Sequence, residues 1–456
     1  MGAVMEVPVW LAALVCLAAA VAVLDRLVAP SFRWVMRRRL ERAVERLNQR
    51  LSLRIQPFKL LNRSYLIERL AHDPEVMRAV EAHLAETGMP RDIAHRQVVE
   101  FAREIAPAFS AMLYFGVGAR ICRWAAEALY RIRLGAFDRK ALQRIDPEAA
   151  VVFVINHRSN VDYLLVTHLA SGAATISYAV GEWARFWPLA PLIRAMGAYF
   201  IRRRERGPLY RAVLRRYVQM AVEGGVTQAV FLEGGLSRDG GLGSPKLGLL
   251  AYLAEGSALR DAIFVPVGVN YDHVLEDRTL LSAYGPHGAG RFDLRPFATF
   301  RAISLWALRG LFRRRERFGV AAVGFGAPLS ARDWAKGGGD VEALGDELMR
   351  RIGLAVPVPP APLVAAIFAE EGGPIPREEA ARRAVDLAER LRAAGAHVVL
   401  PAGRGPGAAE AGIAELAGRG LLVERPAGLT PTDTALIAYY ARSIAHLPRA
   451  PGAPAQ

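Results

Sequence analysis

The strongest constraint on the fold is a change of hydrophobic period near residue 149. Residues 149–155 (AAVVFVI) are a continuous apolar run, which is typical of a buried strand. Four more short apolar runs rich in β-forming residues follow, at residues 174–180, 228–232, 263–269 and 320–325. Helical patterns separate them, for example at residues 209–222 and 247–259. Strands that alternate with helices predict an α/β domain.

Both ends of the chain carry helical patterns instead. Before residue 142 apolar side chains recur every three to four positions, as at Phe101, Ile105 and Phe109, which indicates amphipathic helices. The segment after residue 350 is rich in alanine, and four prolines within residues 357–362 are typical of a linker. We therefore expect four parts. They are a helix at residues 1–30, a helical N-terminal region at 31–115, an α/β domain at 116–350 and a helical C-terminal region at 351–456.

Residues 7–24 form a run without any charged side chain. As a helix it would extend for about 27 Å, slightly less than the ~30 Å hydrocarbon core of a bilayer. Positive charge follows the run and only Glu6 precedes it, which predicts an anchor with the body of the protein on the cytoplasmic side. A helix that lies in the interface or is buried in a core is the alternative.

The positive charge of the chain is concentrated in three stretches. Lys and Arg exceed Asp and Glu by 15, and residues 31–50, 200–216 and 297–318 hold nearly all of the excess. Concentrated cations bind phosphate, whether on a membrane surface, a small molecule or nucleic acid. Aromatic side chains such as Trp34 and Trp306 lie among these arginines, which favours a lipid interface, and we expect no nucleic acid partner.

The first candidate site follows the strand at residues 149–155. Residues 156–163 read NHRSNVDY and lie at the carboxyl end of that strand, where ligands bind in α/β sheets. If Ser159 caps the next helix, Asp162 falls in its first turn and can bind one imidazole nitrogen of His157. The other nitrogen is then available as a general base. Ser159 and Asp162 also fit a capping box, which needs no catalysis, and both interpretations stay open.

Two further loops combine charge with strand ends. Residues 197–204 (GAYFIRRR) lead from an apolar stretch into arginines, a pattern that suits phosphate binding. Residues 231–238 (FLEGGLSR) follow another strand, and Glu233 could orient a substrate hydroxyl or hold an arginine. Either loop could instead be a charged turn. Residues 265–272 (VPVGVNYD) are typical of a strand beside a pocket, with little chemistry of their own.

The order of these motifs is more specific than any one of them. HRSxxDYLL, GAxFIRR, FLEGGxSR and VPVGVNY follow one another from residue 157 to residue 271. This series resembles the four blocks of the glycerolipid acyltransferases, in particular the membrane-bound glycerol-3-phosphate acyltransferase family with its dihydroxyacetone-phosphate relatives. The resemblance extends from about residue 104 to about residue 335, with an echo at residues 439–447 (YYARSIAHL).

This resemblance implies an α/β fold with a mixed sheet flanked by helices, and the activity of a glycerol-3-phosphate 1-O-acyltransferase. His157, oriented by Asp162, would deprotonate the sn-1 hydroxyl, which attacks the thioester of acyl-CoA or acyl carrier protein and gives lysophosphatidate without a cofactor. Backbone N–H groups near the helix start are the expected oxyanion donors. The substrate-binding residues implied are Arg158, Ser159, Arg202, Arg203, Glu233, Gly234, Ser237, Arg238 and Lys246. The implied partner is a phospholipid membrane, and the location is the cytoplasmic side of the cell inner membrane.

Two positions depart from the family pattern. Leu236 stands where relatives usually carry Arg, and Asn160 stands where His is frequent. With Leu236 the phosphate pocket has one guanidinium fewer than in relatives, so the identity of the phosphorylated acceptor stays open. Lys246 or Arg204 could supply the missing positive charge. Dihydroxyacetone phosphate and lysophosphatidate are therefore alternative acceptors.

Three other functions stay open. A basic protein that only binds membrane surfaces would need no catalytic pair. Residues 397–408 are superficially similar to a dinucleotide-binding turn, although Pro406 interrupts it. A metal hydrolase would use His157, Asp162, Glu233 and His273, without any recognised metal-ligand spacing.

Overall fold

The computed structural model describes residue 45 and residues 53–135, 139–170, 174–181, 185, 189–202, 207–256, 260–282, 317–400 and 406–448. The chain divides into two units at Arg54, and the features below belong to the unit Ile55–Gln456. The expected anchor at residues 1–30, Arg203, Arg204 and most of the basic stretch 297–318 lie outside the described residues. Of the helices in the described part, none is both long enough and apolar enough to cross a membrane.

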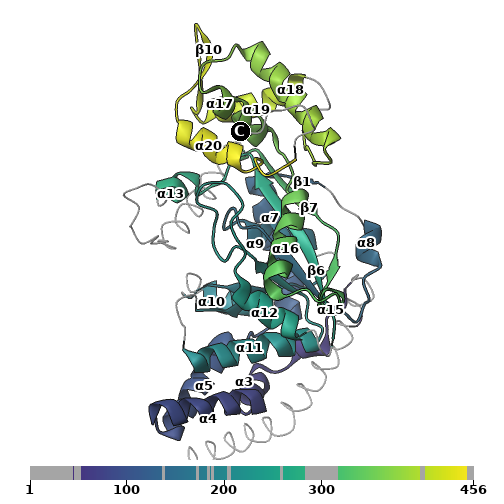
Figure 1. The fold of residues 1–456 in the computed structure, drawn as a ribbon, viewed down its shortest axis with the longest axis vertical. Coiled ribbons are helices and arrows are strands. Elements are labelled where there is room, and N and C mark those ends of the chain that lie inside the picture. Colours follow the sequence, from purple (N-terminus) through teal and green to yellow (C-terminus); the bar gives the residue numbers. More distant parts are fainter. Residues whose placement is uncertain are drawn as a thin grey trace, which may run out of the picture. The chain divides into compact units, whose positions relative to one another are not determined.

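A mixed sheet forms the centre of this unit (Figure 1). Its strand order is β1-β7-β6-β2-β5-β3-β4, and β8 pairs with β6. The strands are β1 (Arg131–Leu134), β2 (Ala150–Ile155), β3 (Ser177–Val180), β4 (Tyr199–Phe200), β5 (Gln228–Phe231), β6 (Ala262–Tyr271), β7 (Val320–Phe325) and β8 (Leu329–Ser330). Strands β4, β3, β5, β2 and β6 are parallel, whereas β7 is antiparallel to β6. The predicted α/β fold with a mixed sheet is confirmed.

The register of the central strands fixes where the candidate site lies. Ile155, the last residue of β2, pairs with Phe231 at the end of β5 and with Val267 of β6. Strand β6 continues beyond that pair to Tyr271. The loops after β2 and β5 therefore emerge side by side at one edge of the sheet, next to the projecting end of β6.

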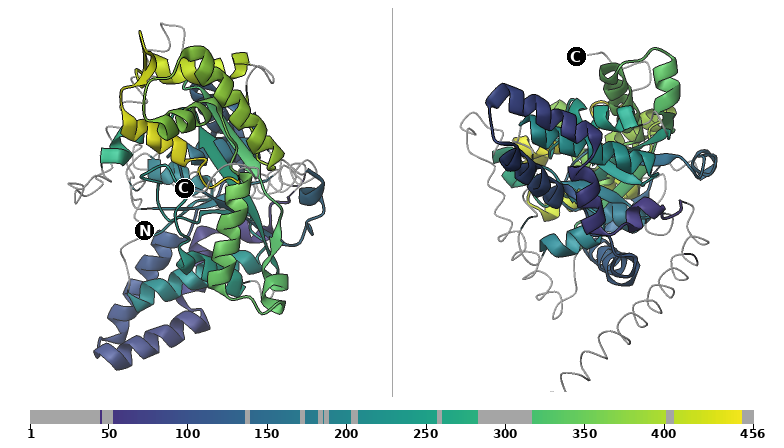
Figure 2. Two further views of the ribbon diagram at one scale, coloured as in Figure 1. Left: turned by 45° about the horizontal axis from the view of Figure 1, so that its top comes forward. Right: turned by 90° about the horizontal axis from the view of Figure 1, so that it is seen from below.

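Helices cover the sheet and extend the unit at both ends (Figures 1 and 2). The N-terminal segments are η2 (Pro57–Leu60), α3 (Arg63–Ala71), α4 (Pro74–Thr87), α5 (Arg91–Ile105), α6 (Ala111–Leu113), η3 (Tyr114–Gly118), α7 (Ala119–Leu129) and α8 (Arg139–Gln143). Those of the α/β domain are α9 (Asp162–Ala170), α10 (Leu189–Ala195), α11 (Pro208–Glu223), α12 (Leu247–Glu255), α13 (Asp277–Ser282), α15 (Ala331–Lys336) and α16 (Val341–Ala355). The last are α17 (Pro360–Glu371), α18 (Arg377–Ala393), α19 (Pro406–Gly418) and α20 (Thr434–Arg442), with the hairpin β9 (Leu422–Arg425) and β10 (Gly428–Pro431) between α19 and α20.

The predicted helical period of the N-terminal region is confirmed by α5. Its buried residues Ala94, Val98, Ala102 and Ile105 follow one another at helical spacing. They belong to the same apolar core as Val76 of α4 and Tyr217 of α11. This face is buried because a helix with one apolar stripe is stabilised only when that stripe packs against a neighbour.

The proline-rich segment at residues 357–362 is not a linker, contrary to expectation. Val358 pairs with Val398, and the Pro357 carbonyl accepts a hydrogen bond from the Asn270 side chain at 3.1 Å. Helix α17 begins at Pro360, where the fixed φ of proline suits a first helical turn. The fixed φ of proline is compatible both with a linker and with a buried helix start, so only the packing of the segment distinguishes the two. The expected boundaries at residues 30, 115 and 350 stay predictions.

Asp272 joins three elements just beyond β6. Its two carboxylate oxygens accept the backbone N–H groups of Val320, at 2.7 Å, and Ala361, at 2.8 Å. The side chain therefore fixes the start of β7 and the first turn of α17 to the end of β6. Burial raises the pKa of the Asp272 carboxyl from its ordinary 3.8 to about 7.

We predict that Asp272→Asn gains stability relative to the wild type as the pH rises from 5 to 7.5. Between pH 4 and 7 the folded wild type holds a proton at Asp272 that the unfolded chain has released, so wild-type stability falls as the pH rises. The expected relative gain exceeds about 1 kcal/mol. Urea unfolding of both proteins, followed by tryptophan fluorescence at the two pH values, measures it. Parallel changes in the two proteins would contradict the raised pKa.

Candidate active site

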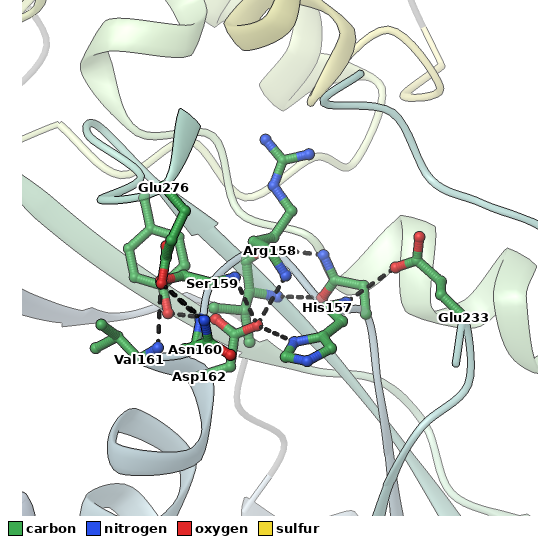
Figure 3. A network of polar contacts seen from close by, with 11 residues as sticks. His157, Arg158, Ser159, Asn160, Val161, Asp162, Glu233 and Glu276 are labelled. Carbon is green, nitrogen blue, oxygen red and sulfur yellow. Dashed lines mark hydrogen bonds and ion pairs between the residues drawn. The ribbon is translucent and has the colours of Figure 1, made fainter. Parts of the chain in front are cut away.

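The turn between β2 and α9, residues 156–161, is held against the neighbouring strand β6. The Asn156 side chain donates to the Val269 carbonyl at 3.0 Å and accepts the Val269 N–H at 2.7 Å. The NH2 group and the oxygen of the Asn156 carboxamide therefore both bind the backbone of Val269 in β6. We refer to this segment as the β2–α9 turn, and Figure 3 shows its polar contacts.

His157 and Asp162 form a buried pair across the β2–α9 turn. Nδ1 of His157 lies 2.9 Å from Oδ2 of Asp162, and the exposed fractions of the two side chains are 3% and 0%. A carboxylate only accepts hydrogen bonds, so Nδ1 carries the proton and Nε2 carries the lone pair. Within the described residues Nε2 has no hydrogen-bond partner. The imidazole therefore has the tautomer that a general base needs.

Asp162 is fixed by further donors. Its Oδ2 also accepts the N–H groups of Arg158, at 2.7 Å, and Ser159, at 3.0 Å, while Tyr271 donates its hydroxyl to Oδ1 at 2.5 Å. The carboxylate thus binds the N–H groups that precede α9 and also orients the imidazole, so the contacts of both interpretations are present, and the catalytic role stays a prediction. Tyr271 is held as a phenol, since burial raises its pKa well above the ordinary value.

Aromatic rings enclose the imidazole. The His157 ring stacks on Phe231 with 3.9 Å between centroids, and Tyr163 meets it edge-on at 5.7 Å. Phe231 ends β5 beside the end of β2, so its contact follows from the parallel pairing of these strands, whereas Tyr163 lies in the first turn of α9. The rings restrict the imidazole to one orientation and exclude water from its faces.

Glu233 ties two loops together through backbone N–H groups, whereas the sequence suggested that it orients a substrate hydroxyl or holds an arginine. Its Oε1 accepts the His157 N–H at 2.9 Å, and its Oε2 accepts the Gly243 N–H at 2.8 Å. Burial raises the pKa of this carboxyl. Ser237 adds to the same junction, because its N–H donates to the His157 carbonyl at 2.8 Å and its hydroxyl donates to the Gly241 carbonyl at 2.6 Å.

The expected oxyanion donors are already bound within the protein. The N–H groups of residues 157–161 donate in turn to Glu233, Asp162, Asp162, Glu276 and the Ser159 hydroxyl. The expectation that N–H groups near the helix start bind the oxyanion is therefore wrong for this turn. A tight turn around a buried carboxylate directs its N–H groups inward, away from a ligand.

Arg202 lies at the same edge of the sheet as His157. It follows β4, and β4, β3, β5 and β2 are parallel neighbours, so about 14 Å of sheet separates the two positions. Its guanidinium makes three contacts of 2.7–3.0 Å with the Glu104 carboxylate of α5. Arg185 binds the same carboxylate, so two guanidinium groups share one negative charge. The excess of positive charge favours an anion nearby.

Arg158 and Ser159 point elsewhere than the sequence suggests. The Arg158 guanidinium is directed away from the imidazole (Figure 3), donates to the Gly240 carbonyl and lies 5.4 Å from the centre of the Tyr439 ring of α20. The Ser159 hydroxyl donates to Glu276 at 2.8 Å. Both side chains thus make contacts within the protein in this structure, and a substrate-binding role for them stays a prediction.

The remaining predicted residues lie on the loop after β5. Gly234 has a φ of +68°, and a Cβ atom built there would lie 2.7 Å from the side chain of Lys246, so glycine is required both by the backbone and by this close approach. Lys246 and Arg238 are exposed. Arg203 lies outside the described residues.

Sequence reasoning missed Tyr271 and Glu276. Tyr271 is the last residue of the VPVGVNY block, which we interpreted as a pocket wall without chemistry, yet it binds Asp162 directly. Glu276 lies five residues further along and binds Ser159 and Asn160. The only sequence signal is their place just after the longest apolar strand, where polar side chains meet the ligand edge of a sheet.

The metal-hydrolase alternative finds no support at these residues. His273 meets the Phe318 ring edge-on at 5.0 Å, and burial lowers its pKa to about 4. In the described part of the chain, no group of three or more His, Cys, Asp or Glu side chains could hold a metal ion.

Comparisons with known proteins agree with the order of the motifs. Residues 137–270 match the family model described as acyltransferase, and residues 304–452 match the glycerol-3-phosphate acyltransferase C-terminal region. A glycerol-3-phosphate acyltransferase of Aeromonas hydrophila subsp. hydrophila is 30% identical over 282 residues, which is 60% of this chain and 34% of that protein. One from Shewanella frigidimarina is 32% identical over 285 residues, 60% of this chain and 34% of that protein.

The chain spans about a third of the length of these curated relatives. A solved 1-acyl-sn-glycerophosphate acyltransferase, PlsC, from Thermotoga maritima is 17% identical and covers 56% of this chain and 78% of its own, with a TM-score of 0.32. The acyltransferase and C-terminal models match in succession and the curated relatives carry one name, so residues 137–270 and 304–452 of this chain are similar to the corresponding regions of the glycerol-3-phosphate acyltransferase family.

Proposed function

We propose that this chain transfers an acyl group from an acyl thioester to the sn-1 hydroxyl of glycerol 3-phosphate, giving lysophosphatidate. The observation that carries the proposal is the buried His157–Asp162 pair, whose Nε2 has no partner within the described residues. The similarity to glycerol-3-phosphate acyltransferases supports the choice of acceptor. Acyl-CoA and acyl carrier protein both supply the required thioester.

The chemistry needs one base and no covalent enzyme intermediate. Nε2 of His157 takes the hydroxyl proton, and the alkoxide oxygen attacks the thioester carbonyl carbon. Asp162 stabilises the imidazolium that forms, as the carboxylate does in a serine protease triad. When the tetrahedral intermediate collapses, the C–S bond breaks and the thiolate takes the proton from Nε2. The oxyanion requires donors other than the N–H groups of residues 157–161, because those are bound internally.

Arg202 is the residue of the described chain best suited to the acceptor phosphate. A planar guanidinium binds phosphate with two parallel hydrogen bonds. Glu104 holds this guanidinium in place with contacts of 2.7–3.0 Å, which reduces the entropy lost when a ligand binds. Dihydroxyacetone phosphate and lysophosphatidate also carry phosphate, so a panel of the three acceptors with labelled acyl-CoA identifies the substrate.

We expect His157→Ala to lower kcat by about 10²–10⁴-fold, because the general base is lost. Asp162→Asn should cause a comparable loss, since the imidazole loses its orienting carboxylate. His95→Ala, on α5, is the matched control and should retain activity. Acyl transfer assays and binding to anionic vesicles are measured together. Wild-type activity in His157→Ala would refute the catalytic assignment, and an inactive wild type that binds vesicles would favour the membrane-binding alternative.

Arg202→Ala should raise KM for glycerol 3-phosphate by roughly 10- to 100-fold, the loss expected for a charge-assisted hydrogen bond. KM for the acyl thioester should stay within about threefold. Arg350→Ala removes an exposed arginine paired with Glu347 on α16 and serves as the control. An unchanged KM for glycerol 3-phosphate would place the phosphate elsewhere.

We propose that the protein rests on anionic lipid through an exposed face of the segment α6–η3–α7. Leu113, Val117, Ile121 and Trp124 recur at helical spacing and are 39–53% exposed. The exposed Arg120 and Arg123 lie beside them in the sequence. An apolar face flanked by arginines suits the boundary between acyl chains and anionic headgroups.

The double variant Ile121→Glu/Trp124→Glu should lower partitioning into anionic vesicles by at least about tenfold, because two carboxylates oppose both insertion and headgroup attraction. Tyr65→Glu is the control, since Tyr65 is 52% exposed on α3, outside the face. Sedimentation of the full chain with vesicles of phosphatidylcholine and phosphatidylglycerol gives the measurement. Equal sedimentation of both variants would exclude this face.

A further inference from the structure

Glu276 is a third carboxylate next to the catalytic pair, and the reaction steps above do not use it. It lies in the turn between β6 and α13, and burial raises its pKa. Both of its oxygens accept hydrogen bonds from the β2–α9 turn. Oε2 accepts the Ser159 hydroxyl at 2.8 Å, and Oε1 accepts the Asn160 side-chain amide at 3.1 Å and the Asn160 N–H at 3.3 Å.

These contacts hold the β2–α9 turn in addition to those of Asp162. Asp162 binds the N–H groups of Arg158 and Ser159, whereas Glu276 binds the next residue and the Ser159 hydroxyl. The Ser159 hydroxyl in turn accepts the Val161 N–H at 3.2 Å. The segment that separates His157 from Asp162 is thus fixed between two carboxylates, as Figure 3 shows.

The position of Glu276 depends on the C-terminal region. The adjacent residue Asp277 accepts the Tyr440 hydroxyl at 2.5 Å and forms an ion pair with Arg419. The Tyr440 hydroxyl also accepts the Val274 N–H at 3.0 Å. Tyr440 belongs to α20 and Arg419 follows α19, so both ends of the short segment that contains Glu276 are bound to the C-terminal helices.

We propose that Glu276 is a positioning residue for the His157–Asp162 pair, and that α20 sets its place through Tyr440 and Asp277. The role rests on the proposed acyl transfer. Glu276 holds the β2–α9 turn so that the imidazole keeps its distance from the carboxylate, and its negative charge favours the imidazolium that forms when Nε2 accepts the proton. The titratable groups that face Glu276 are Asp162, Tyr130, Tyr271 and Tyr439.

The first test is Glu276→Gln, which preserves shape but removes the charge and replaces one acceptor oxygen by a donor. We expect kcat to fall by about 10- to 100-fold, because a small displacement of a catalytic group has an effect of this size. KM for glycerol 3-phosphate and for the thioester should stay within about threefold. The acid limb of the pH–rate profile should move to lower pH, since a charge that favours the protonated imidazole is lost. Glu276→Asp retains the charge and should return the acid limb to its wild-type place.

Two more variants separate positioning from general damage. Tyr440→Phe removes only the hydroxyl that joins α20 to Val274 and Asp277, and kcat should fall by about three- to tenfold with unchanged KM values. Asp272→Asn alters a buried carboxylate of the same loop whose partners are Val320 and Ala361, and it should keep the wild-type kcat and pH profile.

The outcomes are distinct for the two proposals. A folded wild type without acyl transfer contradicts the proposed function. An active wild type whose Glu276→Gln variant keeps kcat and the acid limb contradicts the positioning role alone. The positioning role also fails if Glu276→Gln and Asp272→Asn lose kcat equally, because the loss would then reflect general damage to the loop.

Discussion

The site depends on one carboxylate that receives four hydrogen bonds. Asp162 accepts from the His157 imidazole, from two N–H groups of its own turn and from the Tyr271 hydroxyl. The side chain is fully buried, so its charge is balanced by these donors and not by water. If any donor moved, the carboxylate would lose solvation that nothing else supplies. The arrangement therefore stabilises the turn and the tautomer of His157 together.

The β2–α9 turn is supported from three separate parts of the chain. Glu233 binds it from the loop after β5, Glu276 binds it from the loop after β6, and the Arg158 side chain connects it to Gly240 and Tyr439. The C-terminal region thus contacts the acyltransferase region through the site itself. Arg158 lies in the region matched by the acyltransferase model, residues 137–270, and Tyr439 lies in the region matched by the C-terminal model, residues 304–452.

The arginines at this edge of the sheet are organised by paired charges. Glu104 holds Arg202 and Arg185, and the Arg202 N–H donates to the Tyr210 hydroxyl at 2.7 Å. These contacts fix the orientation of the Arg202 guanidinium.

Local sequence determined the elements and the nearest contacts. Apolar runs located β2, β3, β5, β6 and β7, because a strand buried on both faces must be apolar throughout. The His157–Asp162 pair was predictable too, since the two residues are five positions apart and the helix start between them limits their geometry. The alternation of apolar runs with helical patterns, together with the family blocks, identified the α/β fold.

Tertiary structure decided everything that depends on register and packing. Glu233, Tyr271 and Glu276 reach the β2–α9 turn and Asp162 from 76, 109 and 116 or 117 residues away. The approach of Glu233 follows from the pairing of β2 with β5, and that of Tyr271 and Glu276 follows from how far β6 projects beyond β2. The prolines at residues 357–362 are equally compatible with a linker and with a buried helix start. The contacts that this segment makes with Asn270, Asp272 and Val398 determine that it is a buried helix start. From the sequence we expected the N–H groups of the turn to be available to an oxyanion, whereas in the structure they donate to side-chain oxygens of the protein. Local preferences fix the conformation of a segment, whereas the partner of each buried polar group is fixed only when distant segments meet.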